Sequence, residues 1–372
     1  MISTTNAIAP TEAWIALLGR QDTPVDGVDD YCTFLGKALT ARGIKLTQAR
    51  VSWMENGRIG ALRRLARESA AWRGRWVLMQ YTALSWSRRG FPGFALAVLV
   101  VLRGSGARVA VVFHESTRQG GSRWVHRLRG ACQDWVIRGL YRRAERAIFT
   151  VSLETIAWLP KGGKKAVFIP IGANIPECVA LRPRPTPAPQ QKTVIVFGVT
   201  GEPETAREVE EIAWVMRETR TKLAKLRLVL VVVGRGALEA REQLLNGLRG
   251  YDVEVRVRGV LPAEEIALEF AHADVLLFLR DAITPQRGSA MAGIASGIPI
   301  VGYRGGSVSG PLAEAGIEWS PARDREGLVR GLVRVLSDAS RWAELHERNL
   351  EVQRNHLSWN QIAQQFQEAL PE

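Results

Sequence analysis

The segment Ala273–Arg304, ADVLLFLRDAITPQRGSAMAGIASGIPIVGYR, indicates the fold class most directly. An apolar run typical of a buried strand ends at Arg280, and a polar loop with Asp281 and Arg287 follows it. A helix rich in small residues comes next, and a second apolar run begins at Ile298. Strand, loop, helix and strand in this order form a βαβ unit, which predicts a parallel sheet covered by helices.

Apolar runs alternate with helical spacing along the rest of the chain. In the first half we predict strands at Ala13–Leu18, Trp76–Gln80, Val109–His114, Ala147–Val151 and Ala166–Ile169, and helices at Asp29–Arg42 and Arg123–Arg146. In the second half we predict strands at Thr193–Phe197, Leu228–Val233, Val253–Val257, Val275–Leu279 and Ile298–Val301, and helices at Glu204–Thr219, Leu238–Arg249, Ala263–Ala271, Gly288–Ser296, Asp324–Ser337, Ala339–Asn355 and Trp359–Leu370. The alternation predicts an α/β fold with two Rossmann-like domains.

A proline-rich stretch separates the two sets of elements. Its prolines are Pro176, Pro183, Pro185, Pro187 and Pro189. Such a composition is typical of an extended, exposed connector. We therefore expect an N-terminal domain over 1–176, a linker over 177–192, a C-terminal domain over 193–355 and a last helical segment over 356–372. Open α/β domains bind ligands outside the carboxyl ends of their strands, so these ends are the expected place for the site.

The positive charge is concentrated in the first half of the chain. The 372 residues include 50 Lys and Arg against 37 Asp and Glu, a formal net charge of +13. Residues 1–180 have 26 basic and 12 acidic side chains, whereas residues 181–372 have 24 and 25. This asymmetry predicts an anionic partner for one half, either a membrane surface, a phosphorylated acceptor or nucleic acid. No nucleic-acid-binding module is visible, so nucleic acid is the least expected of the three.

Cysteine usage and hydropathy predict a cytoplasmic protein. Cys32, Cys132 and Cys178 are far apart and form no C-x-x-C pair, so neither a disulfide framework nor a zinc site is expected. The longest apolar run, Phe91–Leu102, is about half of the ~20 residues that a membrane-spanning helix needs. No charged-then-apolar signal peptide opens the sequence.

The predicted helix start at Gly288 and Ser289 is a candidate anion site. Small residues there let a ligand approach the free N–H groups, and the positive end of the helix dipole favours a diphosphate. Arg287 would add a charge-assisted hydrogen bond. The alternative is that the small residues only allow close packing of helix and sheet.

Polar or glycine residues follow three further strands. Gly198 ends the first strand of the second half, and Arg235 stands between two glycines after the next strand. Either turn can be a phosphate loop or a plain strand-to-helix connection. His114 and Glu115 follow a buried strand, where they are suited to proton transfer or to orienting a sugar hydroxyl, unless the histidine is purely structural.

A basic and aromatic segment, Arg118–Ala147, holds eight arginines interleaved with aromatic residues. Arg123, Trp124 and Arg127 lie at its start, and Arg88 and Arg89 occupy a second basic loop. A helix of this kind can lie on an anionic membrane or face an acceptor. It can also be an ordinary domain helix with an arginine-rich solvent face.

Several short motifs, taken in order, resemble the family 4 (group 1) nucleotide-sugar glycosyltransferases, which have the GT-B architecture. These motifs are Asp26-Gly-Val28, Phe113-His-Glu115, Ile169-Pro-Ile-Gly-Ala-Asn174, Val196-Phe-Gly198, Val231-Val-Val-Gly234, Ala273-Asp-Val-Leu276, Ala295-Ser-Gly-Ile-Pro-Ile-Val301 and Trp359-Asn-Gln-Ile362. The similarity spans nearly the whole chain.

The resemblance implies two parallel sheets facing each other across a cleft. The C-terminal domain would bind a nucleoside diphosphate sugar and the N-terminal domain the acceptor, and the last helix would pack back on the N-terminal domain. Gly27 would approach the sugar diphosphate and His114 would lie beside the transferred sugar. Such enzymes usually retain the anomeric configuration and need no metal or other cofactor, because basic side chains and helix N–H groups neutralise the leaving diphosphate.

The sequence departs from the family pattern at the donor loop. The usual pair of glutamates would fall on Thr284 and Ala292. The usual Arg and Lys after the first strand of the second domain are missing, and Arg207 or Arg235 would replace them. The run Arg287-Gly-Ser289 resembles a variant subgroup without the first glutamate, in which serine and backbone groups take over.

The sequence therefore predicts a glycosyltransferase of the hexosyltransferase type. Its acceptor would be lipid-linked or a polysaccharide, in surface polysaccharide or glycolipid synthesis at the inner face of the plasma membrane. The predicted catalytic residues are His114 and Glu115, and the predicted donor-binding residues are Gly27, Gly198, Arg207, Arg235, Asp281, Arg287, Gly288 and Ser289. Two alternatives stay open: a catalytically silent scaffold that binds a partner or a nucleotide, and a nucleotide-sugar epimerase.

Overall fold

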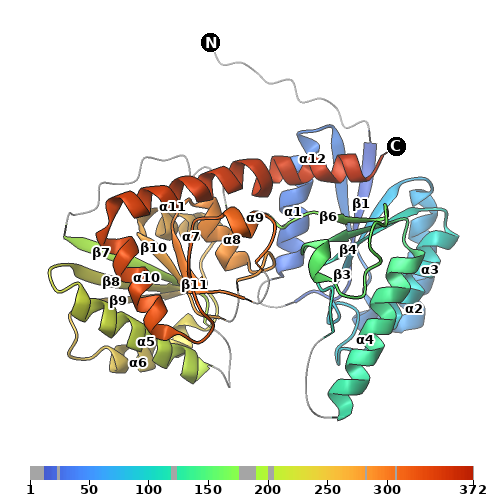
Figure 1. The fold of residues 1–372 in the computed structure, drawn as a ribbon. Coiled ribbons are helices and arrows are strands. Elements are labelled where there is room, and N and C mark those ends of the chain that lie inside the picture. The colour runs from blue at the N-terminus through green and yellow to red at the C-terminus, as the bar shows by residue number, and fades with distance from the viewer. Residues whose placement is uncertain are drawn as a thin grey trace. The chain divides into compact units, whose positions relative to one another are not determined.

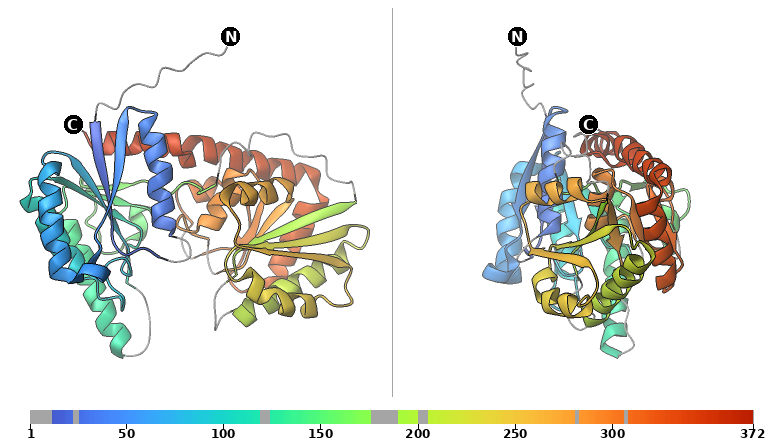
Figure 2. Two further views of the ribbon diagram at one scale, coloured as in Figure 1. Left: turned by 180° about the vertical axis from the view of Figure 1, so that it is seen from behind. Right: turned by 90° about the vertical axis from the view of Figure 1, so that its left-hand side faces the viewer.

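The structure is a computed structural model that describes residues 12–22, 26–118, 124–175, 190–199, 205–280, 283–305 and 308–371. The chain forms two compact units. The first comprises Met1–Ile171 together with Trp359–Glu372, and the second comprises Gly172–Ser358. Each unit has one parallel sheet between two layers of helices (Figures 1 and 2).

The sheet of the first unit has six parallel strands in the order β2-β1-β3-β4-β5-β6. The strands are β1 (Glu12–Leu18), β2 (Ile44–Arg50), β3 (Trp76–Tyr81), β4 (Arg108–Phe113), β5 (Arg146–Phe149) and β6 (Ala166–Phe168). The helices are α1 (Gly27–Thr40), α2 (Trp53–Ser69), α3 (Phe94–Gly104), α4 (Trp124–Arg143) and α12 (Trp359–Ala369), with single 3₁₀ turns at Ala70–Trp72 and Leu153–Thr155. The strand order reverses between β1 and β3, where ligands bind in open α/β sheets.

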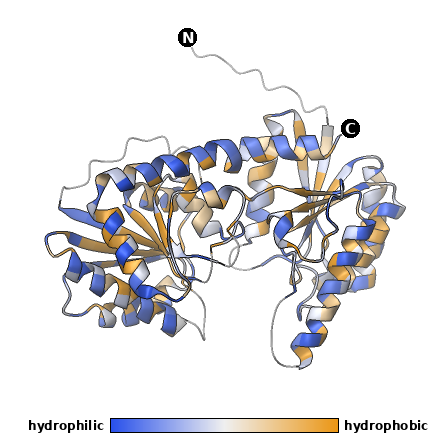
Figure 3. Ribbon diagram, viewed as in Figure 1, coloured by the Kyte–Doolittle hydropathy of each residue, from blue (hydrophilic) through white to orange (hydrophobic). Residues whose placement is uncertain are grey.

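Alternate residues of each strand face opposite helix layers, as the pleat of a strand requires. In β1, Ile15 and Leu17 belong to the core under α2, α3 and α4, whereas Trp14 and Ala16 belong to the core under α1 and α12. The central strands are buried on both faces, so their sequences are mainly apolar and their ribbons are mainly orange in Figure 3.

The last helix, α12, is part of the first unit because it packs on α1. The Trp359 ring stacks on Phe34 with 5.7 Å between centroids and meets the edge of Tyr31 at 5.4 Å. At the other end, the indole N–H of Trp76 donates to the carbonyl of Pro371 at 3.1 Å. Aromatic pairs of this kind add about 0.5–1.5 kcal/mol beyond the burial of their area, so both ends of α12 are held.

The sheet of the second unit also has six parallel strands, in the order β12-β11-β10-β7-β8-β9. The strands are β7 (Gln191–Phe197), β8 (Arg227–Val233), β9 (Val253–Gly259), β10 (Val275–Phe278), β11 (Ile300–Tyr303) and β12 (Ile317–Ser320). The helices are α5 (Thr205–Lys222), α6 (Ala237–Gly247), α7 (Ala263–His272), α8 (Gly288–Ala295), α9 (Pro311–Glu314), α10 (Arg325–Ser337) and α11 (Ala339–Val352), which continues into a π-helical turn, Gln353–Leu357. Helices α5, α6 and α10 cover one face, and α7, α8 and α9 cover the other.

The structure adds two strands that the sequence pattern did not predict. Strand β2 alternates apolar and polar residues at the edge of its sheet, so its apolar signal is weak. Strand β12 has only four residues and contains Glu318, a nearly buried carboxylate that pairs with Arg334 and Arg341. The expectation that Ala166–Ile169 is a buried strand was wrong in one respect, because β6 lies at the sheet edge and is only half-buried.

Two longer helices were also missed, as was the four-residue helix α9. The apolar run at Phe91–Leu102 contains most of α3, which is buried on one face against α2 and α4. Helix α2 has a polar sequence and a kink at Gly57, where φ is +65°. Neither has the regular 3.6-residue apolar spacing that identifies a helix in sequence.

Candidate functional site

In the first unit, Asp26 forms the N-cap of α1 at the carboxyl end of β1. Its Oδ1 accepts hydrogen bonds from the N–H groups of Val28 and Asp29, at 3.1 and 3.3 Å, and its Oδ2 accepts from the N–H of Asp22. Gly27 is the first residue of α1, whose first turn also contains two acidic residues, and no atom lies within 4 Å of the place where a Gly27 Cβ would be. There is therefore open space beside Gly27 where a side chain would be, although the Asp26 carboxylate caps the next two N–H groups.

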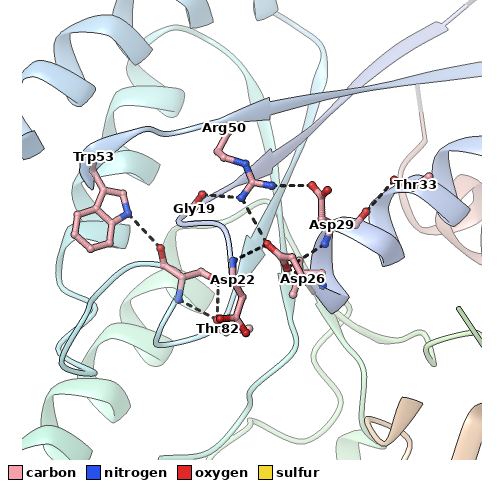
Figure 4. Close-up of polar contacts among 10 residues, drawn as sticks. Gly19, Asp22, Asp26, Asp29, Thr33, Arg50, Trp53 and Thr82 are labelled. Carbon is pink, nitrogen blue, oxygen red and sulfur yellow. Dashed lines mark hydrogen bonds and ion pairs between the residues drawn. The ribbon is translucent and has the colours of Figure 1, made fainter. Parts of the chain in front are cut away.

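The Arg50 guanidinium ties this helix start to the sheet (Figure 4). It donates to Asp29 Oδ1 at 2.7 Å and to the carbonyl of Gly19 at 3.1 Å, and it lies 3.6 Å from Asp26 Oδ2. Gly19 is required at the end of β1 because a Cβ there would lie 2.4 Å from the Ser85 carbonyl oxygen. The turn after β1 is thus held by partly buried ion pairs and by close backbone packing.

His114 directly follows β4, at the same edge of the sheet. Its Nε2 lies 2.8 Å from Gln80 Oε1, and the amide of Gln80 donates to the carbonyl of Leu78. Since the Gln80 oxygen can only accept, the proton of a neutral His114 is on Nε2, and Nδ1 is an acceptor. The ring also meets the edge of Tyr31 at 5.0 Å between centroids.

Burial lowers the pKa of His114 to about 4, although the negative charge of Asp26 opposes this shift. The imidazole is therefore neutral at pH 7 and is not a general acid there. A neutral ring with a fixed tautomer is suited to orienting a ligand hydroxyl. The sequence suggested two roles for His114, proton transfer and orienting a sugar hydroxyl, and a neutral ring suits the second.

Glu115 has a different position. Its Oε2 accepts a hydrogen bond from the N–H of Ala83 at 2.7 Å, in the turn that follows β3. Within that turn, the Thr82 and Ser85 hydroxyls lie 2.7 Å apart, and the N–H of Arg20 donates to the Ser85 carbonyl. Glu115 thus fixes the loop beside His114.

Proton linkage at His114 predicts that the protein loses stability as the pH falls from 6.5 towards 4. In that window the unfolded chain binds a proton on this imidazole and the folded chain does not, so acid favours unfolding. Between pH 7 and pH 5 the expected loss is about 1–2 kcal/mol of unfolding free energy. Urea unfolding at the two pH values measures this loss.

In His114→Asn this part of the pH dependence should vanish, whereas His272→Asn, at an exposed position, should behave as the wild type. Identical pH dependence in all three proteins would contradict the linkage.

In the second unit, the strand order reverses between β7 and β10, and Arg280 lies at this point. Its guanidinium is 3.2 Å from the place where a Cβ of Gly198 would be, and it donates to the Phe197 carbonyl at 3.5 Å. Gly198 has φ of +78°, which favours glycine. The Arg280 charge is thus held over the carboxyl end of β7. The sequence pattern did not predict this residue as part of the site.

Helix α8 begins at the same edge. Arg287 is its N-cap residue, Gly288 is exposed, and no atom lies within 4 Å of the place where a Gly288 Cβ would be. The hydroxyl of Ser289 is buried and has no hydrogen-bond partner among the described residues. A buried hydroxyl without a partner costs about 1–3 kcal/mol, so this helix start favours a ligand that supplies an acceptor.

An arginine-rich pocket of ≈ 730 Å³ lies on the α5 and α10 side of this edge. Its lining residues are Arg207, Glu210, Glu211, Leu279, Tyr303, Arg304, Gly305, Ala322, Arg323 and Arg325. The Tyr303 hydroxyl donates to Glu211, and Arg325 stacks on Trp214 at 4.4 Å. Arg323 has φ of +65°, a strained value for a residue other than glycine. Four arginines against two glutamates make the pocket positive.

The remaining predicted residues are placed as follows. Arg235 is exposed at the end of β8, and its carbonyl accepts from the N–H of Val199 at 2.8 Å, but it does not line the pocket that contains Arg207. Asp281 and Arg123 lie outside the described residues. Within the described ranges, no group of three His, Cys, Asp or Glu side chains could hold a metal ion.

Basic residues that are distant in sequence are adjacent in the first unit. Arg88 and Arg89 are exposed in the loop before α3. The next residue, Gly90, packs on Arg129 of α4, and its carbonyl accepts from the Gln133 amide at 3.0 Å. This loop therefore lies against the helix that presents Trp124 and Arg127 to solvent. In the part of the chain that the structure describes, no helix is long and apolar enough to cross a membrane.

Comparisons with known proteins identify the fold. No family model matches the chain, and no curated protein matches its sequence.

Solved structures match this chain over almost its full length. The Anabaena protein HepE in complex with UDP-glucose has a TM-score of 0.64 at 12% identity, covering 96% of this chain and 98% of that one. Sucrose-phosphate synthase from Thermosynechococcus elongatus has a TM-score of 0.65 at 18% identity, with the same coverage. A trehalose-phosphate synthase from Burkholderia xenovorans in complex with glucose-6-phosphate has a TM-score of 0.62 at 12% identity, covering 97% and 100%. The chain therefore has the two-domain GT-B fold of these structures, as its sequence predicted.

Proposed function

We propose that the protein transfers a sugar from a nucleoside diphosphate sugar to an acceptor. The observation that carries this proposal is the carboxyl edge of the second sheet, where Arg280 lies over Gly198 and α8 begins with a buried, unpartnered Ser289 hydroxyl. A guanidinium together with a helix start is suited to a diphosphate. The structural relative HepE binds UDP-glucose on the same fold, which supports a nucleotide sugar as the ligand.

We assign residues of each unit a role in this reaction. Arg280 and the first turn of α8 hold the diphosphate and stabilise its charge as it leaves, with Arg287 and the arginine-rich pocket adding positive potential. His114, neutral at pH 7, orients a hydroxyl of the transferred sugar. Glu115 positions the loop beside it. The open space beside Gly27 admits the sugar diphosphate.

The same residues support two finer assignments. Because arginines and helix N–H groups are present to neutralise the leaving group, the reaction needs no metal ion in this proposal. The lowered pKa of His114 makes it a weak base, and the Glu115 carboxylate accepts a hydrogen bond from the N–H of Ala83. Neither residue is therefore assigned as the base that an inverting reaction uses to activate the acceptor. We therefore propose that the anomeric configuration is retained. That the transferred sugar is a hexose is proposed from the UDP-glucose bound by HepE.

Calorimetric titration with UDP, GDP, UDP-glucose and other common nucleoside diphosphate sugars tests the proposal. We expect one nucleotide class to bind with micromolar affinity and its sugar to be transferred when a membrane extract supplies the acceptor. Release of a new free nucleotide sugar from donor alone would indicate an epimerase instead. No binding of any member of the panel would refute the enzymatic proposal.

A silent nucleotide-binding scaffold is the second candidate function. One observation favours it. Ala292 of α8 occupies a position where the family that the sequence resembles usually has a glutamate, and its side chain is buried between α8 and the sheet. Binding of a nucleotide without transfer or release of sugar would identify this function.

We further propose that the first unit binds an anionic membrane surface through α4. Trp124, Leu128 and Trp135 are 72%, 56% and 63% exposed and are spaced by four and seven residues, so they form one stripe along the helix. The exposed side chains of Arg127 and Arg138 flank this stripe, and the Arg88–Arg89 loop adjoins the helix. Large exposed aromatic residues among arginines are typical of helices that lie in the membrane interface. Such a position suits a lipid-linked acceptor in polysaccharide or glycolipid synthesis at the inner face of the plasma membrane.

Replacing the stripe, in Trp124→Ala/Leu128→Ala/Trp135→Ala, should weaken binding to vesicles of mixed phosphatidylglycerol and phosphatidylcholine at least tenfold. The reason is that each large apolar side chain contributes about 1.5–3 kcal/mol when it leaves water. Vesicle co-sedimentation measures the change. The matched control Leu238→Ala/Leu245→Ala removes two exposed apolar side chains from α6 in the second unit and should bind as the wild type. Equal losses in both variants, or no loss in either, would contradict the assignment to α4.

A further inference from the structure

A second cavity lies at the opposite edge of the second sheet, at the amino ends of β7 and β8. Its volume is ≈ 700 Å³. Its lining residues are Lys192, Lys222, Leu223, Ala224, Lys225, Leu226, Val335, Leu336, Ser337, Ala339 and Trp342. None of them belongs to the carboxyl edge, where the proposed donor site lies.

The floor of this amino-edge cavity is apolar and fixed. Leu223, Val335 and Leu336 are buried in the core between α5, α10 and the sheet. The Trp342 ring is half-buried, and its N–H donates to the Asp274 carbonyl at 2.7 Å. His346 stacks on the ring at 4.7 Å with 19° between planes. The indole is thus locked as one wall of the cavity.

The rim of the cavity is positively charged. Lys192 pairs with Asp274 at 3.3 Å, and the other carboxylate oxygen of Asp274 already accepts from the N–H of Thr193. Lys222 and Lys225 are exposed, and no carboxylate lies within ion-pair distance of either among the described residues. The lining contains no acidic side chain. Three ammonium groups therefore surround an apolar floor with an aromatic wall.

We propose that this cavity binds an organic anion that joins a planar ring to a phosphate, the chemistry of a nucleoside monophosphate. The ring would pack against Trp342 and the buried leucines, and the phosphate would meet Lys222 and Lys225. The volume is within the range of small-molecule sites and exceeds what an inorganic anion would fill. Lys192 lies at the amino end of β7, and Gly198 directly follows the carboxyl end of the same strand. The cavity is therefore separate from the proposed donor site, at the other end of β7.

Calorimetric titration with AMP tests this site, with adenosine and inorganic phosphate as the two component probes. We expect AMP to bind at least tenfold more tightly than either component. In Lys222→Glu/Lys225→Glu the AMP affinity should fall at least tenfold, because two attractive charges become repulsive. The charge-conserving variant Lys222→Arg/Lys225→Arg should keep AMP binding, which separates charge from damage to the fold.

Two controls distinguish the cavity from other causes of binding. Lys161→Glu/Lys164→Glu makes the same change in net charge at exposed positions of the first unit and should leave AMP binding unchanged. Arg280→Ala alters the proposed donor site and should also leave AMP binding unchanged. The proposal is overturned if AMP does not bind, if it binds equally well to Lys222→Glu/Lys225→Glu, if Arg280→Ala abolishes its binding, or if inorganic phosphate alone binds as tightly.

Discussion

Replacing His114 with alanine is expected to lower the rate of sugar transfer about 100-fold and to leave the affinity for the nucleoside diphosphate within about twofold. In the proposed reaction, the His114 imidazole orients the sugar, and Gln80 and Tyr31 hold the ring in place. The diphosphate is held by groups of the second unit, so its binding should not change. Steady-state transfer rates and calorimetric titration with UDP or GDP measure the two quantities.

His272→Ala is the matched control for this prediction. His272 is exposed at the end of α7, and its Nδ1 lies 2.7 Å from the Leu268 carbonyl, so its loss should not affect transfer. A His114→Ala enzyme with the wild-type rate would remove His114 from the reaction. A large loss of nucleotide affinity with an unchanged rate would assign His114 to ground-state binding instead.

Replacing Arg280 with alanine is expected to weaken binding of the nucleoside diphosphate by about 30- to 150-fold. A hydrogen bond between a guanidinium and a phosphate is worth about 2–3 kcal/mol when it is shielded from water, which corresponds to this loss. Arg280→Lys keeps the charge and loses the planar guanidinium, so its affinity for the nucleoside diphosphate should lie between those of the wild type and Arg280→Ala. Calorimetric titration at constant ionic strength measures the series.

Arg249→Ala is the control for loss of positive charge in the second unit, because Arg249 is exposed after α6 and lies in neither pocket. Thermal unfolding of each variant shows whether the fold is kept, since the Arg280 guanidinium also donates to the Phe197 carbonyl. If Arg280→Ala is fully folded and binds the nucleotide as the wild type does, the diphosphate does not lie at the end of β7, and the roles proposed for Gly198 and α8 fail with it.

The two units carry different parts of the proposed chemistry. The first unit holds a neutral histidine, a rigid helix start and a basic, aromatic surface along α4. The second holds the arginines and helix starts at the carboxyl edge of its sheet and the lysines at the amino edge. Binding of nucleotide and binding of membrane should therefore be separable by mutation.

The fold class and the ends of most strands follow from the amino-acid pattern alone. Central strands such as β4 and β10 are buried on both faces, so they leave unbroken apolar runs that identify a parallel sheet. Such a run also shows which residue follows the strand, and for this reason the pattern is enough to assign His114 and Gly198 to a carboxyl edge. The small residues at the start of α8 are visible in the same way.

What each of these residues contacts depends instead on how the strands are arranged in space. Arg50 reaches the α1 start from β2, an edge strand whose alternating sequence gave no clear signal. Gln80 reaches His114 from a neighbouring strand and selects its tautomer, and Arg280 lies over Gly198 because β7 and β10 are adjacent in the sheet although they are distant in sequence. The amino-edge cavity likewise combines residues from three separate segments. Contacts of this kind depend on the order and register of strands, and hydrophobic periodicity specifies neither.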